Sequence, residues 1–196
     1  QTPPSAARDQ FENDARQELN GLTNLLEDAE VSATTRLVFG KARDKTVNRV
    51  ALEEECDVIL TSGNADEVKQ VLVPVRGKKN FDRILSFAEE LLTATGAAVT
   101  LFHTGDESDR RSGEEILSDA TDRLMNAGVD PDKISQQLSE EADTSQSIVD
   151  ISESFDVLIL GETEPSLRDR ILGNVPAQVT ADTDDPAFVV RSAKSD

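Results

Sequence analysis

The stretch Val71–Gly77, V-L-V-P-V-R-G, most constrains what this chain can fold into, together with the run N-F-D-R-I-L-S-F-A-E-E-L-L that follows it closely. The uncharged residues Val71–Val75 predict a short buried strand, and Gly77 closes a turn. In the following run, apolar residues recur every three or four positions, which predicts an amphipathic helix. Ligands of open α/β sheets lie at the carboxyl ends of such strands, often against the next helix. We therefore expect any ligand to bind at this turn.

The chain after residue 70 alternates nearly all-apolar runs with helical stripes. Such runs are typical of parallel strands that are buried on both faces and joined by helices. The sequence therefore predicts an α/β fold whose sheet is mainly parallel and covered by helices on both faces. The strands are expected at residues 71–75, 98–102, 134–138, 157–160 and 187–190.

The residues before this block carry a similar but shorter pattern. Apolar positions at helical spacing predict a helix from Arg8 to about Ala29. A short strand is expected over Thr34–Phe39, and Asp44 is expected to cap a second helix. The apolar run Asp57–Thr61 predicts another strand. This part therefore reads as helix, strand, helix, strand.

The two parts match at one fixed offset, which indicates an internal repeat. We predict two domains, a truncated repeat over residues 1–67 and a complete one over 68–196. The strands of the truncated copy lack neighbours within it, so they must pair with the second domain, another chain or residues outside this sequence. Because the chain begins at Gln1 and not at Met, we expect it to be a piece of a longer tandem protein. The pairs 99 residues apart are Leu25 and Leu124, Asp44 and Asp143, Val50 and Val149, Leu52 and Ile151, Asp57 and Asp156, and Val58 and Val157.

Charge and composition exclude several classes of function. Acidic residues outnumber basic ones 39 to 20, and the net charge of −19 argues against non-specific nucleic-acid binding, which needs a basic face. The acidic residues are spread along every segment, which favours a halophilic protein with an acidic surface. No apolar run approaches the roughly 18 residues of a membrane span. The single cysteine, Cys56, excludes an internal disulfide.

Residues 68–191 resemble the universal stress protein family, and residues 8–63 resemble it more weakly. The order of strands, helices and glycine loop is that of the family, and so are two local features. The second strand ends in Phe102-His103, and the fourth, D-V-L-I-L-G, runs into the loop G-E-T-E-P-S-L-R-D-R-I-L-G-N-V. The resemblance implies a parallel five-stranded sheet sandwiched by helices, Rossmann-like and similar to the adenine nucleotide alpha hydrolases, usually in a dimer.

The sequence departs from the pattern of the family's nucleotide-binding members. Arg76 stands where they have an acid, Glu164 replaces the second loop glycine, and Asn174 replaces a hydroxyl residue. The loop is also one residue shorter. Glu164 adds a side chain and a like charge where backbone N–H groups close on phosphate, although Arg76 has the charge to contact phosphate directly. The candidate residues of this degenerate nucleotide site are Val75, Arg76, His103, Gly161, Arg168, Gly173 and Asn174.

Catalytic and metal-binding patterns are not found in the sequence. His103 is the only histidine, and we favour a hydrogen-bonded structural role for it over a ligand contact, because no nearby residues give metal-ligand spacing. The chain carries no P-loop and no nucleophile elbow. We therefore expect no enzyme activity, no metal and no cofactor, with an adenine nucleotide as the alternative.

The leading hypothesis is a non-catalytic regulatory or ligand-sensing module, the soluble cytoplasmic part of a secondary transporter. The strings P-V-R-G and G-E-T-E-x-x-x-x-R-I-L-G resemble the divergent stress-protein class found on amino acid permeases and cation–chloride cotransporters. The membrane portion would then be a partner and hold the chain at the inner face of the membrane. The alternative is a stand-alone stress protein that binds ATP or AMP. A homodimer is expected through Phe188–Val190, as an exposed final strand that pairs across a two-fold axis.

Overall fold

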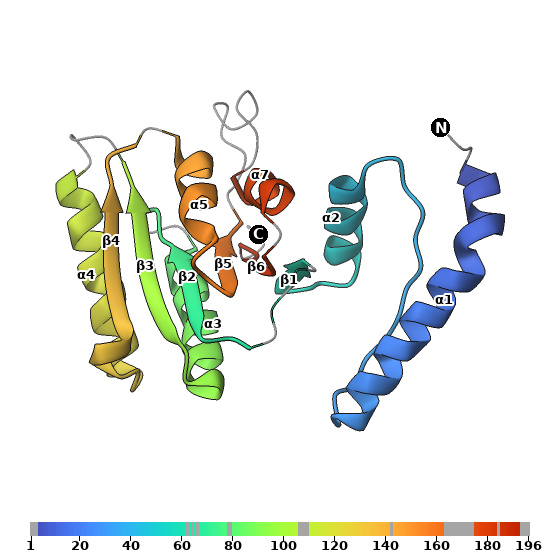
Figure 1. The fold of residues 1–196 in the computed structure, drawn as a ribbon, viewed down its shortest axis with the longest axis horizontal. Helices are drawn as coiled ribbons and strands as arrows, with labels where there is room; N and C mark the ends of the chain where they lie inside the picture. Colours follow the sequence, from blue (N-terminus) through green and yellow to red (C-terminus); the bar gives the residue numbers. More distant parts are fainter. Residues whose placement is uncertain are drawn as a thin grey trace. The chain divides into compact units, whose positions relative to one another are not determined.

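The structure, a computed structural model, describes residues 4–61, 63, 65, 67–77, 80–105, 110–141, 143–162, 175–183 and 185–192. The chain divides into two compact units, Gln1–Glu55 and Cys56–Asp196 (Figure 1).

The first unit contains two helices, α1 (Pro4–Asp28) and α2 (Arg43–Glu53). The prediction of a strand over Thr34–Phe39 is wrong, because that segment has irregular backbone and pairs with no strand that the structure describes. Instead, Arg36 of this segment forms ion pairs with Glu53 at 2.6 Å and with Glu54 at 2.8 Å. Side-chain hydrogen bonds from Arg49 and Arg36 lower the pKa of the Glu53 carboxyl.

The start of α2 also differs from the prediction. Its N-cap residue is Ala42, whose backbone is extended, so Asp44 lies inside the first turn. The reason is that both the amide and the hydroxyl of Thr46 donate hydrogen bonds to the carbonyl of Ala42, at 3.1 and 2.8 Å. These bonds close the first helical turn at residue 42.

The second unit contains one six-stranded sheet, with the strand order β1-β6-β5-β2-β3-β4 (Figure 1). Strands β2 to β6 are all parallel, as predicted, and β1 is added antiparallel to β6. Strand β4 lies at one edge of the sheet, and β1 lies at the other. The strands are β1 (Val58–Thr61), β2 (Gln70–Pro74), β3 (Ala98–Thr104), β4 (Ile134–Ser139), β5 (Val157–Gly161) and β6 (Ala187–Val190).

Helices cover both faces of this sheet, which confirms the predicted α/β class. Val71 and Val73 of β2 point to one face, in a core shared with α3 and α4. Leu72, between them, points to the other face, where it packs with residues of α5 and α7. All three side chains are fully buried, and burial of such a side chain contributes about 1.5–3 kcal/mol. The helices are α3 (Phe81–Thr95), α4 (Arg110–Asn126), α5 (Thr144–Ser152) and α7 (Val175–Asp182), with a short 3₁₀ turn at Pro131–Lys133.

The C-terminal strand is not exposed, so that part of the dimer prediction is wrong. Strand β1 pairs with β6 in the register Val58 with Val190 through Thr61 with Ala187. Thus β1, which the repeat assigns to residues 1–67, is hydrogen-bonded into the sheet of the complete copy. The repeat boundary at residues 67 and 68 stays a prediction, whereas the compact units meet between residues 55 and 56.

Candidate functional site

The candidate site lies where the direction of strand addition reverses in the parallel sheet. From β2 the chain continues to β3 on one side, whereas β5 lies on the other side of β2. In open α/β sheets this switch point, at the carboxyl ends of the strands, is where ligands bind. Val75 and Arg76 follow β2 at this point, and Glu162 follows β5.

Val75 has both backbone polar groups occupied within the fold. Its amide donates to the carbonyl of Phe102 at 2.8 Å, and its carbonyl lies 2.8 Å from Nδ1 of His103. Because a carbonyl can only accept, Nδ1 of His103 carries the proton. The Val75 side chain is 2% exposed. Val75 therefore offers neither a backbone group nor an open side chain to a ligand.

His103 lies in the core and contacts α4. Its ring is 5% exposed and packs against Gly113, where an added Cβ would lie only 2.5 Å from Cδ2 of the ring. This geometry agrees with a hydrogen-bonded structural histidine. The structure thus brings two predicted site residues, His103 and Val75, into direct contact, but as parts of the scaffold.

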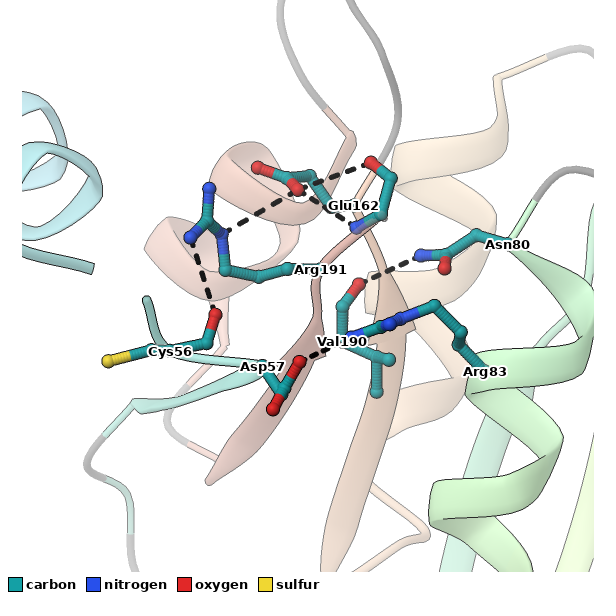
Figure 2. Close-up of polar contacts among 8 residues, drawn as sticks. Cys56, Asp57, Asn80, Arg83, Glu162, Val190 and Arg191 are labelled. Atoms are coloured by element: carbon teal, nitrogen blue, oxygen red, sulfur yellow. Dashed lines mark hydrogen bonds and ion pairs between the residues drawn. The ribbon is translucent and has the colours of Figure 1, made fainter. Parts of the chain in front are cut away.

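Gly161 permits close packing between the end of β5 and the start of α3. A Cβ at this glycine would lie 2.4 Å from Cδ1 of Ile84. Asn80, the N-cap residue of α3, has left-handed backbone with φ of 62° and lies beside Gly161. Its Nδ2 donates to the carbonyl of Val190 at 2.9 Å, which joins α3 to the end of β6 (Figure 2). The absence of a side chain at Gly161 thus has a packing explanation that needs no ligand.

The carboxylate of Glu162 is held by groups that follow β6. Its Oε2 accepts hydrogen bonds from the amide of Ser192 at 3.0 Å and from the Ser192 hydroxyl at 3.3 Å. Nε of Arg191 lies 3.7 Å from the same oxygen (Figure 2). An amide, a hydroxyl and a guanidinium around one oxygen are the donors that an anion would use. In this structure the anion at these donors is the carboxylate of Glu162.

Arg191 connects this point to the start of β1. Its Nη1 donates to the carbonyl of Cys56 at 3.3 Å, and its amide donates to the carbonyl of Asp57 at 2.9 Å. The Asp57 carboxylate in turn pairs with Arg83 of α3 at 2.6 Å (Figure 2). Arg191 therefore contacts both the Glu162 carboxylate and the two residues that lead into β1.

A shallow groove of about 590 Å³ lies beside this network, along α3. Asp57, Asp82 and Glu90 line it together with Arg83, so acidic groups outnumber basic ones there. Two of the acidic groups are paired, since Arg83 contacts Asp57 and Arg123 contacts Asp82. The excess of acidic groups makes the groove a poor place for a phosphate.

The other predicted site residues have different outcomes. Arg76 is exposed, and it forms no hydrogen bond or ion pair with the residues that the structure describes. Arg168, Gly173 and Asn174 lie outside the described residues, as does Glu164, so their predicted roles stay predictions. The sequence reasoning missed Asn80, Ser192 and the holding of Glu162. An Asn before a predicted helix is a signal for the first, but the contact between residues 162 and 192 has no local signal.

Metal and membrane features are absent from the described ranges. No group of three or more His, Cys, Asp or Glu side chains in them is arranged to hold a metal ion. None of the helices among these residues combines the length and the apolar character needed to cross a bilayer.

Comparison with known proteins identifies the fold. No protein family and no curated protein matches the sequence at a significant level. A universal stress protein solved in complex with cAMP is 22% identical with a TM-score of 0.56, over 66% of this chain and 100% of that chain. One from Archaeoglobus fulgidus in complex with dAMP is 21% identical with a TM-score of 0.51, over 62% and 97% of the two chains. Another, from Archaeoglobus fulgidus DSM 4304, is 16% identical with a TM-score of 0.68, over 96% and 80%.

These likenesses show that the chain has the fold of universal stress proteins. The alignment with the cAMP complex accounts for the whole of that protein within about two thirds of this chain. The parallel sheet sandwiched by helices, which the resemblance implied, is therefore confirmed, and β1 is an addition to it.

Proposed function

We propose that this chain is a non-catalytic, ligand-sensing regulatory module of the universal stress protein family. The proposal rests on the arrangement at the switch point between β2 and β5. There, the Glu162 carboxylate already binds the donor groups of Ser192 and Arg191. The position is that of a binding site in this class of fold. A ligand sensor needs no catalytic residues, because it responds whenever the ligand binds two conformations of the chain with different affinities.

An adenine nucleotide is the second candidate, as the ligand of a stand-alone stress protein. It is favoured by the two structural neighbours of the same fold that were solved with cAMP and dAMP. The internal carboxylate opposes it, because a phosphate at the same donors would meet the charge of Glu162. We therefore expect nucleotide binding to be weak in the natural sequence and to strengthen when that charge is removed.

Isothermal titration calorimetry with ATP, AMP, cAMP and dAMP in high salt tests this expectation. Glu162→Gln keeps the shape of the side chain but removes its charge. If phosphate binds at these donors, the variant should bind about tenfold more tightly, which corresponds to about 1.4 kcal/mol. No heat at millimolar nucleotide with either protein would contradict the nucleotide candidate.

Glu153→Gln is the matched control for this titration. Glu153 is exposed at the end of α5, just before β5 begins, and so lies near the amino ends of the parallel strands, whereas Glu162 follows the carboxyl end of β5. The same change of charge there should leave the affinity unchanged. An equal gain in both variants would mean that net charge, and not the candidate site, controls binding.

The non-catalytic part of the proposal has its own measurement. Phosphate release from ATP should stay at the rate of buffer alone. Release above that rate, if lowered by a substitution at the switch point, would contradict the proposal.

We further propose that the module is the cytoplasmic part of a secondary transporter of amino acids or ions. The resemblance of P-V-R-G and of the 161–173 loop to such domains supports it. A membrane portion would be its partner and would tether it to the inner face of the cell membrane. The gene sequence that flanks the codons for residues 1–196 tests this association. We expect it to encode segments long enough to span a membrane, and their absence would contradict the association.

A further inference from the structure

Strand β1 covers the edge of β6 that would otherwise end the parallel sheet. It is the one strand of the described sheet that runs antiparallel to its neighbour. Its four residues face the four residues of β6 one to one, from Val58 with Val190 to Thr61 with Ala187. A free edge formed by the uncharged strand Ala187–Val190 would invite pairing with another chain.

Specific contacts hold both ends of β1 in place. At its start, Arg191 donates to the carbonyls of Cys56 and Asp57, and Arg83 pairs with the Asp57 carboxylate at 2.6 Å. At its end, the Thr61 hydroxyl lies 3.2 Å from both the carbonyl and the amide of Ala187. These contacts add to the backbone ladder, so β1 is docked at both ends.

The segment after β1 also fits closely against the approach to β6. Gly63 lies so near the backbone there that a Cβ would come within 2.2 Å of the Pro186 nitrogen and 2.4 Å of the Asp185 carbonyl carbon. Only a glycine leaves room for this approach. The glycine at position 63 therefore allows the segment after β1 to pack against the segment that leads into β6.

Strand β6 would stay in place without β1. It is paired in parallel with β5 on its other side, and Phe188 packs on Phe87 of α3 with ring centroids 4.9 Å apart. Asn80 also holds the carbonyl of Val190. Removal of β1 would thus leave an intact, uncharged edge.

We infer that β1 is an intramolecular cap that keeps two copies of this chain from pairing through β6. The partner that the uncapped edge fits is a second copy of the chain. Two copies of β6 related by a two-fold axis would run antiparallel, which is the direction that β1 already has beside β6. The cap therefore occupies the position and the direction of the strand from a second copy.

Proline substitutions in β1 test the cap, because the ladder alternates. The hydrogen bond from the Arg191 amide to the Asp57 carbonyl shows that these two residues form a hydrogen-bonded pair. In an antiparallel ladder such pairs recur at every second residue. The Ile59 amide therefore points toward β6, and the Leu60 amide points away from it. Ile59→Pro should release β1 and double the mass measured by light scattering after gel filtration. Leu60→Pro, at a side chain that is 58% exposed, should remain a monomer like the natural chain.

These outcomes decide the inference in both directions. A folded Ile59→Pro variant that stays monomeric at all concentrations would overturn it. A natural chain that is already a dimer while β1 is paired with its own β6 would overturn it as well. Circular dichroism of each variant establishes that it is folded.

A disulfide staple gives a test that does not depend on the proline variant. Val58 and Val190 form a non-hydrogen-bonded pair, whose Cα atoms lie about 4.5 Å apart in such ladders, within the range for a disulfide. In a Cys56→Ser background, Val58→Cys with Val190→Cys should oxidise within one chain at low concentration. Added to Ile59→Pro, the staple should suppress the dimer. A disulfide between chains, or a dimer that persists with the staple closed, would overturn the cap.

Discussion

At the scale of single residues, side chains that looked like ligand groups are used by the scaffold. His103 lies at the carboxyl end of a strand, where site residues gather, but its ring is buried between Val75 and α4. Gly161 begins the loop that resembles a phosphate site, but its missing side chain makes room for Ile84. The residue with the arrangement of a bound anion is Glu162, whose partners come from the far end of the sequence.

Gly113→Ala tests the packing of His103. The new Cβ would lie 2.5 Å from Cδ2 of His103 and 2.9 Å from Cδ1 of Leu138, so the ring or the helix must shift. Overpacking of this kind costs about 1–3 kcal/mol, which outweighs the gain of up to about 1 kcal/mol from helix propensity. Urea unfolding should show the loss. Gly21→Ala, in open space on α1, is the control and should not destabilise the chain.

At the scale of elements, local signals located the helices and strands, and pairing decided which of them joined the sheet. Segments Thr34–Phe39 and Asp57–Thr61 both read as short strands. Only the second found a partner, because β6 offers it a ladder and anchors at both ends. The first is held through Arg36 to the end of α2 instead.

Asp143→Ala tests the N-cap of α5, which is Asp143 in the structure. The Asp143 side chain accepts a hydrogen bond from the Gln146 amide at 3.1 Å and so satisfies a donor of the first turn. Its loss should lower the free energy of unfolding by about 1 kcal/mol, within a range of about 0.5–2. Asp150→Ala in the same helix is the control. Among the described residues, Asp150 accepts only from the side chain of Gln146, an exposed contact worth about 0.2–0.5 kcal/mol. An equal loss there would contradict a specific cap.

At the scale of the whole molecule, the net charge of −19 disfavours the compact state through self-repulsion. The ion pairs of the described surface are mostly exposed, as between Arg16 and Glu12 or Arg111 and Glu115, and such pairs contribute little each. Stability should therefore depend on screening by salt. A halophilic protein is therefore expected to be more stable in concentrated salt.

Thermal unfolding in KCl tests that dependence. Raising KCl from low concentration to the molar range should stabilise the chain by about 1–2 kcal/mol, or about 2–8 °C in Tm for a chain of this size. Sucrose, which stabilises without screening charge, is the control. A Tm that is unchanged or lower in KCl would contradict the expectation.

The sequence by itself determined the order of helices and strands after residue 70, the parallel sheet and the turn at Val71–Gly77. These follow from periodicity and from short-range turn chemistry, which act within one segment of the chain. Only the tertiary structure decided that β1 joins β6, that Glu162 binds Ser192 and Arg191, and that His103 points into the core. Each of those depends on contacts between residues far apart in the chain, whose free energy no local pattern carries.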